Sequence, residues 1–449
     1  MLAEELRDSA TRLDALSGGD LSTDLRAVMS CSLRSLDRDA ETAFLLLALA
    51  PGPDIGLPAA ASLLAAPPAR ARRLLGVLEN AHLVQQYLPD RYRLHDLVRL
   101  FGAERGEEKL TDEMRDEAWE RLFDFYLRTA HEGSLLIHPH KLPEIELDAS
   151  PPGTHRMPLE NVAAALHWFD TEQPCLLAAH RFALRRKWHL YLYRLTWSLD
   201  TFQERRHHVR DLLSTWRSGL VAARWLGEPG YEIEACRRLA NAASRMDDHA
   251  EGMVWAQRAL DLAESSGDLL NLALTHISLS CLCGEHNDFP GFLDHSLRAL
   301  GLFERLGYPG KVAHALGHVG EAHAMMGHYG PAEKYCLRAL ALARRHRNVA
   351  VEADTLHSLG YIAHHTGNHR VARHRYEQSL ARFRDNGNRY DEATALEHLG
   401  GTYTALGETS EARATLRQAL ALYRMQGRDT QAERVAQALV LLPSEELDA

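Results

Sequence analysis

Residues 355–380, TLHSLGYIAHHTGNHRVARHRYEQSL, decide the fold. Two stretches with helical patterning are separated here by the break Thr366-Gly367-Asn368. Leu359-Gly360, Gly367, Ala372, Tyr376 and Leu380 recur forty residues later as Leu399-Gly400, Gly407, Ala412, Leu416 and Leu420. Earlier units in the same register contain Gly320, Gly327, Ala332, Cys336 and Leu340, then Ser280, Phe289 and Ala299, and then Ala240, His249 and Ala259. The 40-residue period is therefore regular over five units.

Each unit is expected to be two helices joined by a turn. Small residues such as Gly360 and Ala372 allow the two helices to approach closely, and leucines fill the seam between units. One helix pair cannot bury its apolar face alone, whereas a stack can. A glycine near the end of the second helix suits a left-handed C-cap, and Arg347 alone breaks the series Gly227, Gly267, Gly307, Gly387 and Gly427.

The unit resembles the long form of the tetratricopeptide repeat (TPR) at Leu359-Gly360, Gly367, Ala372 and Tyr376. The resemblance implies a right-handed α-solenoid whose concave groove takes a protein, a peptide or a small ligand. We expect five TPR units over residues 231–430. A helical connector with a degenerate first repeat precedes them at 106–230, and a capping helix and tail follow at 431–449. Trp197, Trp216 and Trp225 indicate tight helical packing in the connector.

Composition limits the class of protein. The chain has 449 residues, enough for two or three domains, and a formal net charge of −10 argues against non-specific nucleic-acid binding by the whole molecule. The longest apolar run, residues 43–50, is too short to cross a membrane, and the acidic N-terminus lacks a signal pattern. Six widely separated cysteines favour reduced thiols in a cytoplasmic protein.

Residues 1–105 predict a different architecture. A helix at 1–20 precedes a winged-helix-like domain at 21–105. Helices are expected at 24–36, 38–49, 58–65, 68–81 and 96–105, with a β-hairpin from residues 83–87 and 91–94. The whole chain is thus expected to be all-α apart from one small hairpin.

The sequence Arg93-Leu94-His95-Asp96 at the end of this hairpin resembles the Met-His-Asp motif of the STAND nucleotide-switch ATPases. With Pro51-Gly52-Pro53 and the repeats, it resembles the C-terminal half of the large SARP transcription regulators. In that family a DNA-binding domain, an activation domain and an NB-ARC ATPase precede the winged helix. The resemblance implies that His95 contacts the β-phosphate of ADP and that Asp96 holds the loop bearing it.

A phosphate-binding loop is not expected in this sequence, because the nearest match, Gly310-Lys311, has Arg305 and Val312 at the other required positions. The nucleotide role of His95 and Asp96 therefore needs an ATPase partner or a longer parent chain. The alternative interpretation is that both residues cap the helix that follows. A further hypothesis is direct DNA binding through Arg70, Arg72 and Arg73, although an ordinary solvated helix face also fits these arginines.

The first helix of each unit is expected to face the groove. Counted from Gly360 as the eighth position of a unit, the polar groove residues are Glu234, Arg237, Asn241, Arg245, Glu285, His314, Glu321, Asp354, His357, Tyr361, His364 and Glu397. A metal site at His314 and His318 is not expected, because His318 should pack within its unit. The sequence also predicts no catalytic centre and no cofactor.

The favoured interpretation is a non-catalytic regulatory module that binds a protein, peptide or small ligand in its TPR groove and signals to a nucleotide-switch transcription regulator. Two alternatives stay open: a stand-alone TPR adaptor for a biosynthetic pathway, and a winged-helix regulator that binds DNA.

Overall fold

The computed structural model describes residues 21–246 and 248–443. They fall into two compact units. Unit 1 includes residues up to 133 with 145–160 and 167–191, and unit 2 comprises 134–144, 161–166 and the chain from 192 onward. The helix expected at 1–20 and the last residues of the tail lie outside the described residues.

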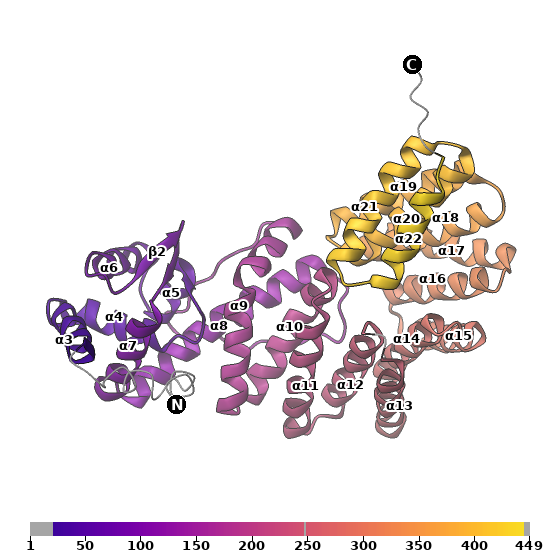
Figure 1. Cartoon of the computed structure of the whole chain (residues 1–449). Coiled ribbons are helices and arrows are strands. Elements are labelled where there is room, and N and C mark those ends of the chain that lie inside the picture. The colour runs from indigo at the N-terminus through magenta and orange to yellow at the C-terminus, as the bar shows by residue number, and fades with distance from the viewer. Residues whose placement is uncertain (1–20, 247, 444–449) are drawn as a thin grey trace, which may run out of the picture. The chain divides into compact units, whose positions relative to one another are not determined.

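Unit 1 contains helices and one small sheet (Figure 1). Its helices are α3 (Leu21–Arg34), α4 (Arg38–Leu49), α5 (Leu57–Leu63), α6 (Pro68–Asn80), α7 (Asp96–Lys109) and the first part of α8 (Asp112–Ile137). The sheet is antiparallel, in the order β1-β3-β2, with β1 (Ile55–Gly56), β2 (Gln85–Leu88) and β3 (Arg91–Arg93). The helices and the hairpin match the sequence expectation, whereas β1 was not expected, because two residues are too few for a strand pattern.

Local chemistry sets the ends of the unit 1 helices. The Asp37 carboxylate accepts a hydrogen bond from Ala40 N at 2.8 Å and caps α4. Pro68 begins α6, where its fixed φ suits the first turn. Helices α4 and α7 meet closely at Gly102, where a Cβ atom would lie 2.6 Å from the Cβ of Ala48. These features hold α7 and the hairpin before it against the core of unit 1.

The connector continues through α9 (Val162–Arg186), α10 (His189–Arg206) and α11 (Val209–Leu226). Trp197 and Trp216 are completely buried, as expected, but Trp225 is 70% exposed. The expectation for Trp225 was wrong because it follows Trp216 by nine residues. At 100° per residue, that spacing puts the two side chains on opposite faces of α11.

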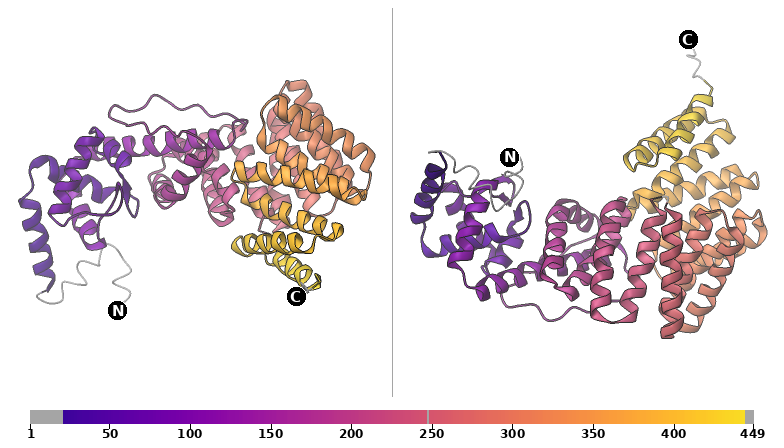
Figure 2. Two further views of the ribbon diagram at one scale, coloured as in Figure 1. Left: turned by 90° about the horizontal axis from the view of Figure 1, so that it is seen from above. Right: turned by 60° about the horizontal axis from the view of Figure 1, so that its bottom comes forward.

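The repeats follow as successive helix pairs (Figures 1 and 2). They are α12 (Pro229–Ser244) with α13 (His249–Ser266), α14 (Leu269–Glu285) with α15 (Phe289–Leu306), α16 (Pro309–Met325) with α17 (Tyr329–Arg345), α18 (Val349–His365) with α19 (His369–Asp385), and α20 (Arg389–Leu406) with α21 (Thr409–Met425). Helix α22 (Asp429–Leu441) covers the last pair. The helical solenoid expected from the 40-residue period is confirmed.

The glycines of the repeat lie at close helix crossings, as the sequence predicted. A Cβ atom on Gly320 would lie 2.5 Å from Cys336 Sγ. On Gly360 it would lie 2.7 Å from the Tyr376 ring, and on Gly400 it would lie 2.6 Å from Leu416 Cδ2. Only a residue without a side chain lets the paired helices approach this closely.

The turns between units also follow the sequence. Gly267 and its counterparts end the second helices in the left-handed conformation. Arg347, which replaces glycine in that series, adopts the same conformation with φ of 53°. The backbone geometry of the turn is therefore imposed by the repeat, and arginine accepts a conformation that costs L-residues about 1–2 kcal/mol.

Candidate ligand pocket inside the solenoid

A stripe of polar side chains follows the inner face of the first helices of the repeats. On α16 the stripe contains His314, His318, Glu321 and Met325, and it continues on α18 with Asp354 and His357 and on α20 with Asp391 and Thr394. Residues three or four apart share one helix face, so each helix presents its stripe to the same side. Together with Arg245 and Arg428, these residues line a concave pocket of about 500 Å³, here named the inner pocket.

The inner pocket forms where unit 2 curves back on itself. The Tyr390 ring, at the start of α20, lies between two guanidinium groups: Arg245 Cζ is 4.6 Å from the ring centroid and Arg428 Cζ is 4.0 Å from it. The His207 ring, from the turn after α10, is 5.0 Å away. Arg205 Nη1 also donates to the Asn386 carbonyl at 3.4 Å. The beginning of the solenoid thus contacts its fifth repeat through the Arg245–Tyr390–Arg428 stack.

Half of the groove residues expected from the sequence line the inner pocket, namely Arg245, Glu285, His314, Glu321, Asp354 and His357. Asn241, Tyr361, His364 and Glu397 are not among its lining residues. His364 Nδ1 lies 3.0 Å from Thr402 Oγ1, and Glu397 forms an ion pair with Arg434 at 2.7 Å. The inner pocket therefore contains only part of the groove lining expected from the sequence.

The structure corrects the placement of Glu234 and Arg237. Glu234 is 0% exposed and Arg237 is 4% exposed, and they pair with each other at 2.5 Å. Arg238 joins them by bonding Glu234 at 2.7 Å and Asp200 at 2.9 Å. The sequence pattern assigned them to the groove because it could not show that the connector helix α10 covers this part of α12. Both residues belong to a buried ionic cluster.

Several residues of the inner pocket were missed. His318, expected to pack within its unit, lines the pocket with its ring 4.5 Å from that of His314. Tyr390, Asp391 and Arg428 come from the first residues of α20 and the turn before α22. The repeat pattern gives no signal for them, because their position depends on how far the solenoid curves. In the described part of the chain, no group of three or more His, Cys, Asp or Glu side chains could hold a metal ion.

The environment of the inner pocket disfavours the charged form of its carboxylates. Burial raises the pKa of Glu321 to about 7, with a further contribution from Asp391. The Asp354 carboxylate is accessible to water in the pocket, yet the surrounding repeats displace bulk solvent and, with Asp391, raise its pKa well above the usual range. Burial also lowers the pKa of His318 and of His357 to about 4, so these imidazoles are neutral at pH 7.

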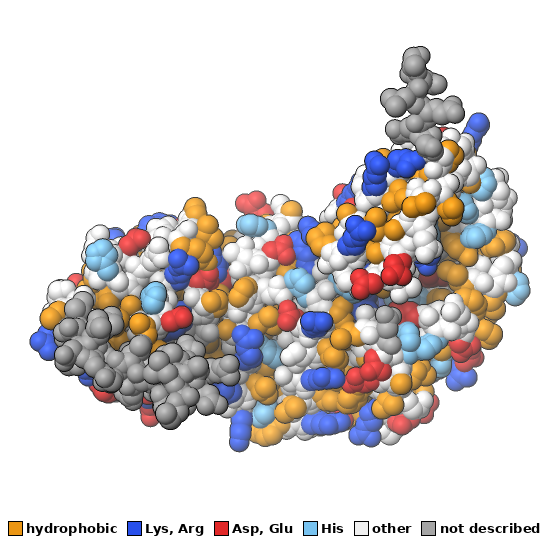
Figure 3. All heavy atoms as spheres, viewed as in Figure 1, with side chains coloured by type: hydrophobic (Ala, Val, Ile, Leu, Met, Phe, Trp, Pro, Cys, Tyr) orange, Lys and Arg blue, Asp and Glu red, His pale blue; other side chains and the backbone are white. Residues whose placement is uncertain are grey.

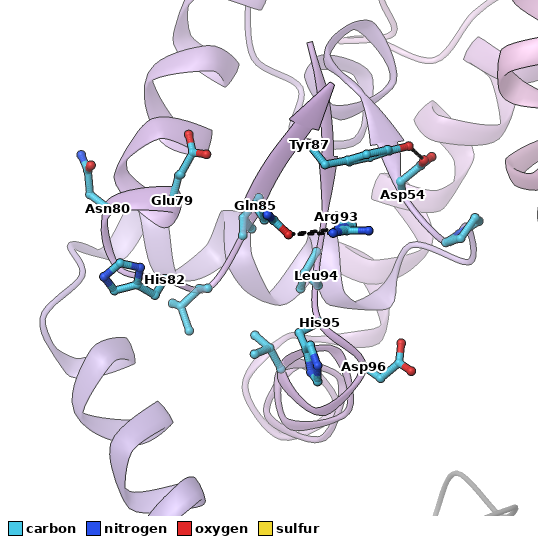
Figure 4. Close-up of a pocket in the computed structure, with 14 residues that line it drawn as sticks. Asp54, Glu79, Asn80, His82, Gln85, Tyr87, Arg93, Leu94, His95 and Asp96 are labelled. Carbon is cyan, nitrogen blue, oxygen red and sulfur yellow. Dashed lines mark hydrogen bonds between the residues drawn. The ribbon is translucent and has the colours of Figure 1, made fainter. Parts of the chain in front are cut away.

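A second concave surface lies in unit 1. A pocket of about 1130 Å³, here named the His95 pocket, is lined by Asp54, Tyr87, Arg93, His95 and Asp96 among others (Figure 4). The Tyr87 hydroxyl donates to the Asp54 carboxylate, and Arg93 donates to Gln85 Oε1 at 3.0 Å. His95 and Asp96 are both exposed at the start of α7.

The capping role considered for His95 and Asp96 is not seen. His95 occupies the N-cap of α7 without a side-chain capping bond, and Asp96 is the first residue of the helix. A carboxylate there interacts favourably with the positive end of the helix dipole, which needs no specific hydrogen bond. Both side chains therefore remain available to a partner.

The arginines considered for DNA binding are exposed on α6. Arg70 pairs with Asp39 at 2.6 Å and Arg72 pairs with Asp90 at 3.1 Å. Two of the three positive charges are thus matched by acids of the same unit. On the face seen in Figure 3, basic and acidic side chains are likewise interspersed.

Two family models match the repeats. Both describe a tetratricopeptide repeat, and they cover residues 312–348 and 351–425. The helix pairs within these residues are tetratricopeptide repeats. No helix among the described residues is both long and apolar enough to span a membrane.

The curated relatives are regulators. The chain is 32% identical over 347 residues to the regulatory protein AfsR of Streptomyces griseus, an alignment covering 76% of this chain and 35% of the relative. It is 38% identical over 186 residues to AfsR of Streptomyces coelicolor, covering 40% of this chain and 18% of the relative. The chain thus spans about a third of the length of the first relative.

Two solved structures match the chain at low sequence identity and with TM-scores below 0.5. A STAND protein with a tetratricopeptide-repeat sensor from Pyrococcus horikoshii matches with a TM-score of 0.42 and 15% identity, over 91% of this chain and 63% of that one. NprR in complex with its cognate peptide NprX matches with a TM-score of 0.47 and 15% identity, over 77% and 93% of the two chains.

Proposed function

We propose that this chain is the non-catalytic sensor part of a transcription regulator. The inner pocket receives a ligand, and unit 1 passes the signal to a nucleotide-switch ATPase. The similarity to two regulatory proteins supports the regulatory role, and the tetratricopeptide repeats support ligand binding on the concave side. A cytoplasmic location agrees with this role.

The observation that carries the proposal is the position of the inner pocket. Its lining combines Arg245 from the first repeat, helices of the middle repeats, and Tyr390 and Arg428 from the end of the solenoid. A ligand that contacts all of these residues binds most tightly at one curvature of the solenoid. Ligand binding therefore selects among curvatures, which is the property a sensor requires.

The output surface in this proposal is the His95 pocket. The resemblance to STAND proteins implies that His95 and Asp96 face a nucleotide held by a neighbouring ATPase domain, and both are exposed on a concave surface. Helices α3 to α7 and the sheet act in this proposal as a winged-helix hinge. Direct DNA binding has less support, because Arg70 and Arg72 are paired with acids.

The proposal is tested by measuring binding of the full chain to a purified NB-ARC domain from a SARP regulator, loaded with ADP. We expect His95→Ala combined with Asp96→Asn to weaken binding at least tenfold. Glu107→Gln is the matched control, since Glu107 is exposed on the same helix but does not line the His95 pocket. Equal binding by the wild type and the double variant, or no binding at all, would refute the nucleotide-switch role and favour the stand-alone adaptor.

A further inference from the structure

The inner pocket contains carboxylates that lack an ion-pair partner among the described residues. Within residues 21–246 and 248–443, Glu321 and Asp354 form no ion pair within 4 Å. They lie on adjacent first helices, α16 and α18, and Asp391 follows on α20. Carboxylates enclosed together repel one another, so this arrangement disfavours the empty pocket.

The neighbouring cations are already engaged. Arg245 Nη2 bonds Glu204 at 2.8 Å and its guanidinium stacks on Tyr390. Arg428 donates to the Tyr390 carbonyl at 3.2 Å and stacks on the same ring. The histidines at 314, 318 and 357 are held neutral by burial. Arg205 opposes the raised pKa of Asp354 through its charge, but it donates to the Asn386 carbonyl at 3.4 Å and pairs with neither acid. A cationic ligand can therefore supply the ion pair that Glu321 and Asp354 lack.

A second feature points to an acceptor on the same ligand. Arg245 Nη1 is buried, and it has no hydrogen-bond partner in the structure. A buried donor left without a partner costs about 1–3 kcal/mol. Arg245 lines the inner pocket, so a rotation of its guanidinium group would present this nitrogen to a carbonyl or carboxylate oxygen of a ligand. The ligand that satisfies both features has a cationic group and a carbonyl group.

Aromatic rings complete the recognition surface. Phe289 is partly exposed and lines the inner pocket beside the charged groups, whereas the Tyr390 ring already stacks with Arg245 and Arg428. Aromatic faces favour cations and the apolar stems of long basic side chains. A volume of about 500 Å³ suits a small ligand or a short peptide segment rather than a folded domain.

We propose that the inner pocket binds a short peptide, with an arginine or lysine side chain held by Glu321 and Asp354 and a peptide carbonyl held by Arg245. This inference rests on the proposed ligand-binding role of the inner pocket and specifies the chemistry of the ligand. A free polyamine supplies the cationic groups but no carbonyl, so the unpartnered Arg245 nitrogen favours the peptide.

The test uses three probes with the full chain: the blocked peptide acetyl-Tyr-Arg-Ala-amide, the same peptide with uncharged citrulline in place of arginine, and spermidine. Isothermal titration should show saturable binding of the arginine peptide and at least tenfold weaker binding of the citrulline peptide. In the variant Glu321→Gln with Asp354→Asn, the two peptides should bind equally. Arg245→Met should weaken binding of the arginine peptide further than binding of spermidine.

The matched control is Glu333→Gln with Glu411→Gln, which removes the same charge from exposed positions on α17 and α21 and should leave the preference for arginine intact. Equal affinity of the wild type for the arginine and citrulline peptides would overturn the inference, as would absence of saturable arginine-peptide binding. Spermidine binding as tightly as the arginine peptide, without sensitivity to Arg245→Met, would replace the peptide by a polyamine. None of these results decides the NB-ARC interaction, which has its own assay.

Discussion

Replacing Glu321 by glutamine should stabilise the protein, and the gain should depend on pH. In the folded chain the pKa of Glu321 is raised from 4.5 to about 7, because burial and Asp391 disfavour its charged form. The folded state therefore holds this proton more tightly than the unfolded state does. As pH rises from 4.5 to 7, the wild type loses stability that the uncharged glutamine variant keeps.

The magnitude follows from the two pKa values. Their difference corresponds to about 3 kcal/mol of folding free energy above pH 7. Glu321 is partly accessible to solvent in the pocket, which screens the interaction, so we expect a gain of about 1–2 kcal/mol. Its charged neighbours are Asp391 on α20, Asp354 on α18 and Arg245 after α12, while the nearby histidines are neutral.

Thermal unfolding of the full chain, followed by circular dichroism at pH 4.5 and pH 8, measures the effect. Glu321→Gln should raise the Tm by about 1–3 °C at pH 8 and by much less at pH 4.5. Glu333→Gln, at an exposed position on α17, should change neither value. A Tm gain of equal size at both pH values would refute the electrostatic origin, and a loss of stability at pH 8 would refute the reasoning altogether.

Three further predictions concern the repeats. Gly360→Ala should destabilise the chain by about 1–3 kcal/mol in chemical denaturation, because the added Cβ atom would collide with the Tyr376 ring. The control Gly401→Ala should be neutral or stabilising, because the space around Gly401 is open. Arg347→Gly should stabilise by about 1 kcal/mol, because glycine adopts the left-handed turn without strain; an unchanged midpoint would argue against that conformation. Tyr390→Ala should weaken contact between the two ends of the solenoid and increase its radius of gyration in small-angle scattering. An unchanged radius would show that the Arg245–Tyr390–Arg428 stack does not maintain the curvature.

The sequence predicted the features that depend on neighbouring residues along one repeat. The tight crossings at Gly360 and Gly400 follow from the 40-residue period, because a small residue that recurs at a fixed register of a helical stack marks a point where two helices must approach closely. The inner stripe at His314 and Glu321 was located for a similar reason, since helical spacing alone determines which residues share a face. Arg347, which replaces glycine after the second helix of its repeat, also adopts the left-handed backbone conformation of those glycines.

Features that depend on distant segments could not be predicted from the sequence. Glu234 and Arg237 occupy groove positions of their repeat, yet an ionic cluster with Arg238 and the connector residue Asp200 buries them. The distance between Tyr390 and Arg245 depends on the curvature that the solenoid accumulates over four repeats. That curvature is the sum of small rotations between neighbouring repeats, and the sequence of a single repeat does not reveal them. The unpaired carboxylates became apparent only once all their neighbours were known.

The location of the ligand is tested most directly by amide hydrogen exchange of the full chain, with and without saturating acetyl-Tyr-Arg-Ala-amide. A peptide in the inner pocket should slow exchange in α16, α18 and the first turn of α20, together with the turn at Arg245. Protection confined to the outer helices α17, α19 and α21, or to unit 1, would contradict ligand binding inside the solenoid.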